Sequence, residues 1–286
     1  MVSLKVFNSV GEELRRIEQA YDVRVLYACE SGSRAWGFAS QDSDYDVRFI
    51  YVHSRDWYLS IEDRRDVIEE PISDSLDISG WELRKTLRLL RKSNPPLLEW
   101  LKSPVVYAWD EEFVSDFKQL ADEYYSPARC FQHYLHMALG NARDYLKHDQ
   151  VCMKKYLYVL RPLLACRWIE RNMGQVPMLF DELVEGIVED MGVCAAIANL
   201  LARKKAGDEL DRGPKDVVLS RYIDAELAGL EQIQSEEESA PDPAVLNHFF
   251  QSYCLKSPAL ALACSGRTKI IPLLNLEGRD STLHET

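Results

Sequence analysis

The sequence lacks an excess of positive charge. Its 286 residues include 34 lysines and arginines against 46 aspartates and glutamates, which gives a net charge of −12 and a pI of about 5.1. The overall field of such a chain does not attract nucleic acid or an anionic membrane. Any phosphate-rich ligand must therefore be bound by a local group of basic residues or through a metal ion.

Long apolar runs and paired metal-ligand motifs are also missing. No uninterrupted apolar stretch reaches the ~18 residues of a membrane-spanning helix, and residues 1–10 show no basic start before an apolar core. The seven cysteines are scattered and never in C-x-x-C spacing, which is typical of buried thiols in a reducing compartment. The histidines lack metal-ligand spacing too. We therefore expect a cytoplasmic protein that does not associate with membranes.

The first part of the chain alternates helix and strand patterns. Residues 11–21 have the spacing of an amphipathic helix, and residues 23–29 form a β-branched and aromatic run typical of a buried strand. Residues 81–92 predict a second amphipathic helix, which the prolines at 95 and 96 end. Further strands are predicted at residues 47–52, 66–70, 76–78 and, as an edge strand, 105–109.

From residue 110 onwards the pattern changes to long segments with a 3.6-residue period. The predicted helices are residues 111–124, 128–147, 152–172, 180–186, 188–205 and 216–234. We therefore predict an α+β fold, with a small mixed-sheet domain over residues 1–110 and a helical domain over residues 111–264. Residues 235–243 are an acidic, proline-bearing linker, and residues 265–286 are left as an unassigned tail.

Small polar residues and carboxylates come together between the first two predicted strands. Ser31, Gly32 and Ser33 follow the first strand, and a strand, a Gly-Ser turn and a helix start present backbone N–H groups to an anion. Asp44 and Asp46 stand two residues apart at the start of the next strand, so both side chains would project to one face. Mg²⁺ is usually held by one or two carboxylates together with substrate phosphates. The stretch thus predicts a metal-assisted phosphate site.

A third carboxylate, Asp77, lies between Leu76 and Ile78 on a predicted strand. A charge between apolar neighbours is rarely left unpaired, so a metal or a basic partner is expected there, with Arg84 or Lys85 as structural alternatives. Arg34 and Arg48 are equally compatible with ion pairs and with ligand binding. Three converging aspartates would repel each other and bind protons more tightly unless a cation neutralised them.

These motifs resemble a known superfamily. A G-S pair, a dozen residues, D-x-D on a strand and a third aspartate on a neighbouring strand are similar to the pattern of DNA polymerase beta-type nucleotidyltransferases. The segments around them resemble the predicted bacterial and phage nucleotidyltransferases linked to RNA repair, over residues 23–168. These segments are E-S-G-S-R-A-W-G-F-A-S-Q-D-S-D-Y-D, L-D-I-S-G-W-E-L-R-K, N-P-P-L-L-E-W-L and K-K-Y-L-Y-V-L-R-P-L-L-A-C-R-W-I.

The resemblance implies a role for each residue of the sheet motifs. Gly32 and Ser33, with Arg34 beside them, would hold the phosphates of a nucleoside triphosphate. The aspartates would be catalytic and would bind two Mg²⁺ or Mn²⁺ ions, with the third aspartate next to the attacking hydroxyl. These three are Asp44, Asp46 and Asp77.

In the predicted helical domain, Lys155 and Tyr156 match the family's K-Y pair, and Arg161 follows in the same segment. All three are expected to bind the nucleotide, although they are also compatible with a helix surface that packs against the first domain. Arg161 lies about 240° from Lys155 around an ideal helix, so only one of the two is expected to reach the phosphates directly.

The implied activity is transfer of a nucleoside monophosphate from a triphosphate to a hydroxyl, with pyrophosphate released and an RNA end as the leading acceptor. One alternative keeps the chemistry on a protein side chain or a small molecule such as an aminoglycoside, because an acidic protein attracts a cationic acceptor. The other alternative is a catalytically silent nucleotide- or RNA-binding module. No stable protein partner is predicted.

Overall fold

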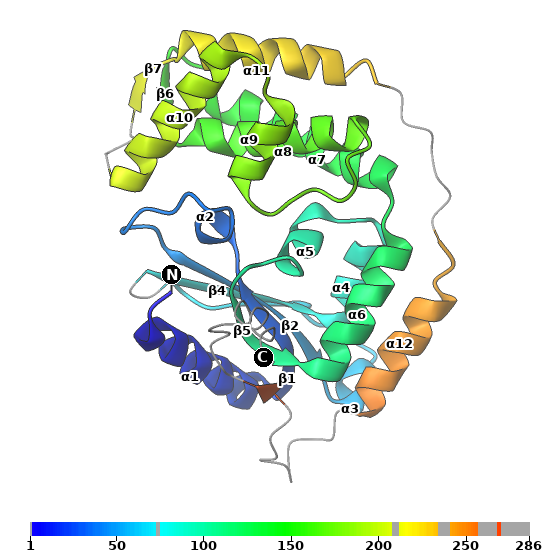
Figure 1. The fold of residues 1–286 in the computed structure, drawn as a ribbon. Coiled ribbons are helices and arrows are strands. Elements are labelled where there is room, and N and C mark those ends of the chain that lie inside the picture. The colour runs from blue at the N-terminus through cyan, green and yellow to red at the C-terminus, as the bar shows by residue number, and fades with distance from the viewer. Residues whose placement is uncertain (1, 73–74, 208–211, 234–240, 257–267, 270–286) are drawn as a thin grey trace, which may run out of the picture.

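The computed structural model describes residues 2–72, 75–207, 212–233, 241–256 and 268–269. A mixed sheet with helices on both faces forms one part of the molecule, and a group of helices lies beyond one end of it (Figure 1). The predicted α+β fold is therefore confirmed. Among the described helices, none combines the length and the apolar character needed to cross a membrane.

The sheet has the order β3-β4-β2-β1-β5-β8. Its central strands β2 and β4 are parallel, and the other pairs are antiparallel. The expected edge strand β5 is followed by the two-residue β8, so it does not form the edge. The strands are β1 (Val23–Glu30), β2 (Tyr45–His53), β3 (Val67–Glu69), β4 (Leu76–Glu82), β5 (Val106–Asp110) and β8 (Thr268–Lys269).

Helices cover both faces of the sheet (Figure 1). Helix α1 (Leu4–Tyr21) packs on one face, and it begins well before the predicted residue 11 because Phe7 and Val10 extend its apolar stripe. The other face is covered by α4 (Leu83–Arg91), α5 (Pro95–Trp100), α6 (Glu111–Tyr124) and α12 (Ala244–Leu255).

Strand β4 is longer than predicted and continues to Glu82, because its parallel pairing with β2 runs that far. Helix α4 therefore begins at Leu83 rather than at residue 81. Helices α6 and α12 fall in the predicted helical domain yet pack on the sheet through Phe113 and Tyr253. The domain boundary at residue 110 stays a prediction. Residues 235–240 of the predicted linker and residues 265–267 and 270–286 of the predicted tail lie outside the described residues.

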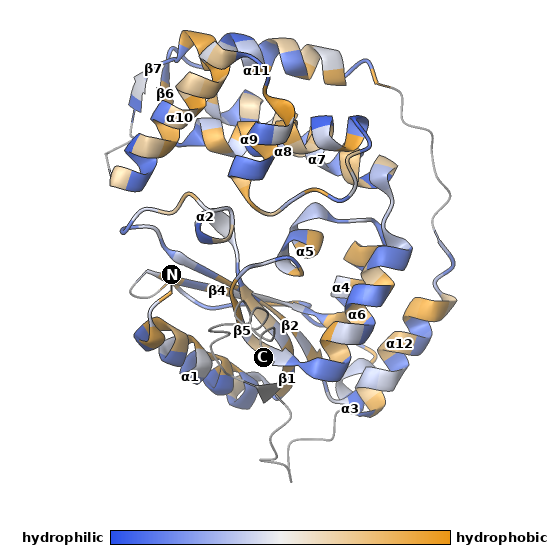
Figure 2. Cartoon of the chain, in the orientation of Figure 1, coloured by the Kyte–Doolittle hydropathy of each residue, from blue (hydrophilic) through white to orange (hydrophobic). Residues whose placement is uncertain are grey.

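The remaining helices share a separate core, in which α8 is central and buried on nearly every side. Figure 2 shows apolar and polar residues mixed on the helices of this part. The short helix α2 (Gly32–Ala35) and α5 lie between the sheet and these helices (Figure 1). The elements of this part are α7 (Pro127–Tyr145), β6 (Gln150–Cys152), α8 (Lys155–Glu170), α9 (Phe180–Ile187), α10 (Met191–Ala206), β7 (Arg212–Pro214) and α11 (Val217–Leu230).

His53, at the end of β2, is expected to make the stability of the fold depend on pH. Its ring stacks on Trp57 at a centroid distance of 3.9 Å, and burial, followed by the charge of Arg64, lowers its pKa from 6.5 to about 4. The unfolded chain binds the proton more tightly, so the free energy of unfolding rises with pH between about 4 and 6.5. We expect His53→Phe, which keeps the stacked ring, to lack this slope.

The measurement is urea unfolding of both proteins at about pH 5 and about pH 7.5. The wild type is expected to lose roughly 2 kcal/mol more than His53→Phe at the lower pH. Equal losses in the two proteins would show that His53 titrates normally.

Candidate active site

The Gly-Ser turn lies directly against the carboxylate strand. Strand β1 ends at Glu30, and the N–H of Ser31 donates to the carbonyl of Asp46 at 2.8 Å. Gly32 then begins α2 with a φ of +57°, a left-handed conformation that favours glycine. A Cβ on Gly32 would overlap Oδ2 of Asp46. Only a glycine therefore allows the turn to approach the carboxylate this closely, and the following Ser33 is largely buried.

Gly32→Ala is expected to lower both the stability of the protein and the nucleotidyl transfer that the resemblance implies. The left-handed conformation costs an alanine about 1–2 kcal/mol, and the added methyl group displaces the Asp46 carboxylate. A misplaced catalytic group typically lowers the rate about 10²-fold. Urea unfolding and a transfer assay measure the two effects.

Gly140→Ala is the matched control, because Gly140 lies within α7 and no heavy atom surrounds its Cβ position within 4 Å. It should leave transfer unchanged and stabilise the helix by up to about 1 kcal/mol. Full transfer by Gly32→Ala would contradict the proposed contact with Asp46.

Asp46 and Asp77 lie side by side on the parallel strands β2 and β4. One terminal nitrogen of Arg48 contacts both carboxylates, at 3.3 Å from Asp46 Oδ1 and 2.8 Å from Asp77 Oδ2. Burial raises the pKa of Asp46, and the negative charges of Asp77 and Asp44 raise it further while Arg48 lowers it. The expected repulsion among the carboxylates therefore acts on Asp46.

Asp77 differs from its expected environment in two ways. Its side chain is 31% exposed rather than buried, because it lies at the start of β4. Its basic partner is Arg48, and the alternatives Arg84 and Lys85 are wrong. Arg84 lies over the ring of Tyr58, whereas Lys85 is paired with a different aspartate.

Asp44 is exposed and precedes β2 by one residue, so it is not part of the strand as predicted. The loop that carries it is shaped by Arg34, whose guanidinium donates to the carbonyl oxygens of Ser43 and Asp44 and lies 3.9 Å from the ring centroid of Tyr45. These contacts give Arg34 a structural role in the loop. A direct contact between Arg34 and the nucleotide stays a prediction.

Glu30 fixes the backbone of Asp46, a role that was not predicted from the sequence. Its buried carboxylate accepts the N–H of Asp46 at 2.9 Å and the hydroxyl of Tyr107. Burial raises the pKa of Glu30 to about 7, against the two hydrogen bonds. The only local signal is a charged residue that directly follows a continuous apolar strand.

The structure buries Tyr156, which disagrees with its predicted contact with the nucleotide. Its side chain is fully buried in the core of α8. The hydroxyl lies 2.6 Å from Ser220 Oγ and accepts the N–H of Asp216 at 3.1 Å, so it connects α8 to the start of α11. A ring in this position has no surface left for a ligand.

Arg161 is likewise buried, and its contacts connect α8 with other elements of the protein. This position disagrees with its predicted contact with the phosphates. Its guanidinium is 2.6 Å from Glu99 on α5, donates to the carbonyl of Met178 at 3.2 Å and lies 4.7 Å from the ring centroid of Trp36. The Glu99 carboxylate also accepts the indole N–H of Trp36 and the hydroxyl of Tyr134. The network links α8 to α5 and to the end of α2.

Lys155 is not buried, so its predicted contact with the nucleotide stays a prediction. A second lysine, on α10, lies near the site. The ammonium of Lys204 lies 3.4 Å from the hydroxyls of Ser40 and Ser43, in the loop before Asp44. Burial, together with the positive charge of Lys154, lowers the pKa of Lys204. The sequence did not single out Lys204, because nothing local indicates that the end of α10 meets this loop.

Comparison with known proteins identifies the family. The model of the RNA repair pathway DNA polymerase beta family, RlaP, matches residues 7–252. The chain belongs to this family. An uncharacterized protein of Bacillus subtilis strain 168, YcgL, is 52% identical over 225 residues, which cover 79% of this chain and 86% of that protein.

A crystal structure of a nucleotidyltransferase-like protein from Exiguobacterium sibiricum 255-15 aligns with a TM-score of 0.30 and 14% identity, over 85% of this chain and 75% of that one. The assignment to the RlaP family therefore rests on the sequence. A member of this polymerase beta-type family is a nucleotidyltransferase, and its substrate is a nucleotide. The Gly-Ser turn and the aspartates fall within the matched region.

The carboxylates of this chain fit a metal ion whose remaining ligands come from the phosphates of the substrate. Within the described ranges, no three His, Cys, Asp or Glu side chains form a ready metal site. Asp46 and Asp77 nevertheless lie side by side, with Asp44 near enough to affect the pKa of Asp46. Mg²⁺ commonly takes one or two carboxylates and obtains its other oxygens from phosphates and water. These residues would hold it once a triphosphate is bound.

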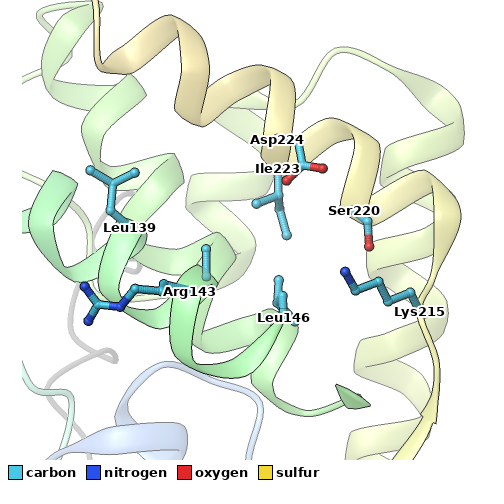
Figure 3. A pocket seen from close by; sticks show the side chains of 8 residues that line it. Leu139, Arg143, Leu146, Lys215, Ser220, Ile223 and Asp224 are labelled. Atoms are coloured by element: carbon cyan, nitrogen blue, oxygen red, sulfur yellow. The ribbon is translucent and has the colours of Figure 1, made fainter. Parts of the chain in front are cut away.

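A separate cavity of about 300 Å³ lies between α7 and α11 (Figure 3). Arg143, Lys215 and Asp224 give it polar walls beside Leu146 and Ile223. None of the predicted site residues lines it. The RlaP motifs lie at the sheet, so the candidate active site is there and not in this cavity.

Proposed function

We propose that this protein is an active, Mg²⁺-dependent nucleotidyltransferase that moves a nucleoside monophosphate from a triphosphate to an RNA hydroxyl. The contact of Gly32 with the Asp46 carboxylate carries this proposal, because it brings a phosphate-binding turn against a metal-binding group. All three aspartates are present, which argues against a silent binding module. A manganese ion would suit the same oxygen ligands.

Each group has a defined task in the proposed reaction. The backbone at Gly32 and Ser33 binds the terminal phosphates, and Asp44, Asp46 and Asp77 hold the metal. Bound Mg²⁺ would neutralise charge on the triphosphate and favour in-line displacement. The acceptor oxygen bonds to the α-phosphorus as the bond to the bridging oxygen breaks, so pyrophosphate leaves.

Two residues complete the proton and charge balance of the proposed step. Asp77, beside the attacking hydroxyl, takes its proton. Arg48 offsets part of the negative charge of Asp46 and Asp77 before the metal and the nucleotide bind, since it contacts both carboxylates. Loss of that neutralisation would leave two half-buried carboxylates to repel each other.

RNA is the favoured acceptor because the family is an RNA repair family and because cations lie near the carboxylates. Lys204 contacts the loop before Asp44. Lys154 lies close enough to Lys204 to affect its pKa. These two lysines provide the local positive charge that the net charge of −12 denies to the chain as a whole. The same acidic balance supports a cationic small molecule or a protein side chain as the second candidate.

The acceptor is tested by incubating the protein with Mg²⁺ and each α-labelled triphosphate. RNA ending in a 3′-hydroxyl, the same RNA with its 3′ end blocked by phosphate, an aminoglycoside and a cell protein extract serve as separate acceptors. Label on the free 3′ end alone supports the proposal. Label only on the aminoglycoside or on protein would overturn the RNA acceptor and leave the chemistry intact.

A further inference from the structure

Tyr158 is an exception on α8. Most of this helix is buried from Tyr156 to Cys166, yet the Tyr158 side chain is 36% exposed. Its position is fixed, because its backbone carbonyl accepts the side-chain N–H of Asn141 at 2.8 Å. A large aromatic ring is thus held partly in solvent by a rigid helix.

The surroundings of the Tyr158 ring connect it with the phosphate-binding turn. The ring of Trp36, which directly follows α2, packs edge-on against it at a centroid distance of 5.9 Å. Trp36 is itself fixed by the hydrogen bond from its indole N–H to Glu99 and by the Arg161 guanidinium. Tyr158 therefore packs against a fixed residue, Trp36, which directly follows the helix that begins at Gly32.

Tyr158 also lies close to the carboxylates. Its pKa is raised first by burial and then by the negative charges of Asp46 and Asp44, which places its hydroxyl within electrostatic reach of both. The side chain belongs to the helical part, whereas the carboxylates belong to the sheet. A triphosphate bound at the turn and the aspartates would have its nucleoside beside this helix.

The Lys155 ammonium lies over the Tyr158 ring. The Lys155 ammonium is 4.8 Å from the ring centroid of Tyr158 and 4.3 Å from that of Tyr145. Among the described residues, no carboxylate lies within ion-pair distance of this ammonium. A long side chain held by exposed cation–π contacts alone can move aside at little cost.

We propose that Tyr158 is the stacking platform for the nucleobase of the bound triphosphate, with the base taking the place of the Lys155 ammonium on the ring. This inference rests on the proposed function of the site. The displaced ammonium turns toward the phosphates. Aromatic stacking accepts any base, so Tyr158 provides affinity and orientation for the nucleoside without a hydrogen-bond code.

The test compares a ligand that has a base with one that has none. Binding of each nucleoside triphosphate and of inorganic tripolyphosphate is measured by calorimetry with Mg²⁺ present. Tyr158→Ala should bind the nucleoside triphosphate about tenfold more weakly and tripolyphosphate as well as the wild type does, whereas Tyr158→Phe should bind both normally. Lys155→Ala should weaken both ligands.

Tyr21→Ala, at an exposed tyrosine of α1, is the control and should change neither ligand. Unchanged nucleoside triphosphate binding by Tyr158→Ala would overturn the stacking platform but not the proposed function. An equal loss for tripolyphosphate would also overturn it, since that result indicates a structural role. A wild type that binds neither ligand would overturn the proposed function, and the stacking platform with it.

Discussion

Replacing Asp46 with asparagine is expected to lower nucleotidyl transfer about 10³-fold, the scale of a lost metal ligand that is worth several kcal/mol. Asparagine has nearly the same size and keeps the backbone N–H that donates to Glu30. Burial and the neighbouring carboxylates raise the pKa of Asp46, so its charge does not stabilise the folded chain. We therefore expect no loss in the free energy of unfolding. Single-turnover transfer and urea unfolding measure the two quantities.

The matched control is Asp56→Asn, which removes an exposed carboxylate from α3 (Arg55–Tyr58). It should transfer at the wild-type rate. Comparable rates for Asp46→Asn and Asp56→Asn would refute the assignment of Asp46, whatever the acceptor is.

Arg161→Leu is expected to lower the free energy of unfolding by about 3–5 kcal/mol, because it leaves the buried Glu99 carboxylate without its cation. The hydrogen bonds from Trp36 and Tyr134 to Glu99 remain, but they do not balance its charge. Urea unfolding with a linear extrapolation measures the change.

Two further variants separate this effect from lost packing. Arg161→Leu combined with Glu99→Leu should regain much of the loss, because no unpaired charge then remains. Arg65→Leu breaks the exposed pair with Glu69 and should cost less than about 1 kcal/mol. A loss below 1 kcal/mol for Arg161→Leu would contradict the structural role given to this arginine.

The sheet and its motifs were predictable from the sequence because their signals are local. An apolar run predicts each central strand. The Gly-Ser turn follows the first of these strands, and in an antiparallel pair the end of one strand lies beside the start of the next. The contact of Gly32 with Asp46 follows from the antiparallel pairing of β1 and β2, which places the end of β1 beside the start of β2. The third aspartate was found because a carboxylate between two apolar residues needs a partner, although that partner proved to be Arg48.

The roles of the helical residues were not predictable in the same way. Helix α8 is buried on nearly all sides, so its sequence shows no polar face from which solvent exposure could be inferred. Tyr156 and Arg161 therefore resembled ligand residues, although their partners Ser220 and Glu99 are about sixty residues distant in the chain. The contact of Lys204 with the Ser43 loop spans an even longer separation.

Transfer of label from two forms of one triphosphate tests the central claim most directly. The protein is incubated with Mg²⁺, 3′-hydroxyl RNA and the triphosphate labelled either at the α- or at the γ-phosphorus. The proposed reaction places the α-label on the acceptor and releases the γ-label as pyrophosphate, and Asp46→Asn does neither. Appearance of the γ-label on the acceptor, or an undiminished product from Asp46→Asn, would contradict the account.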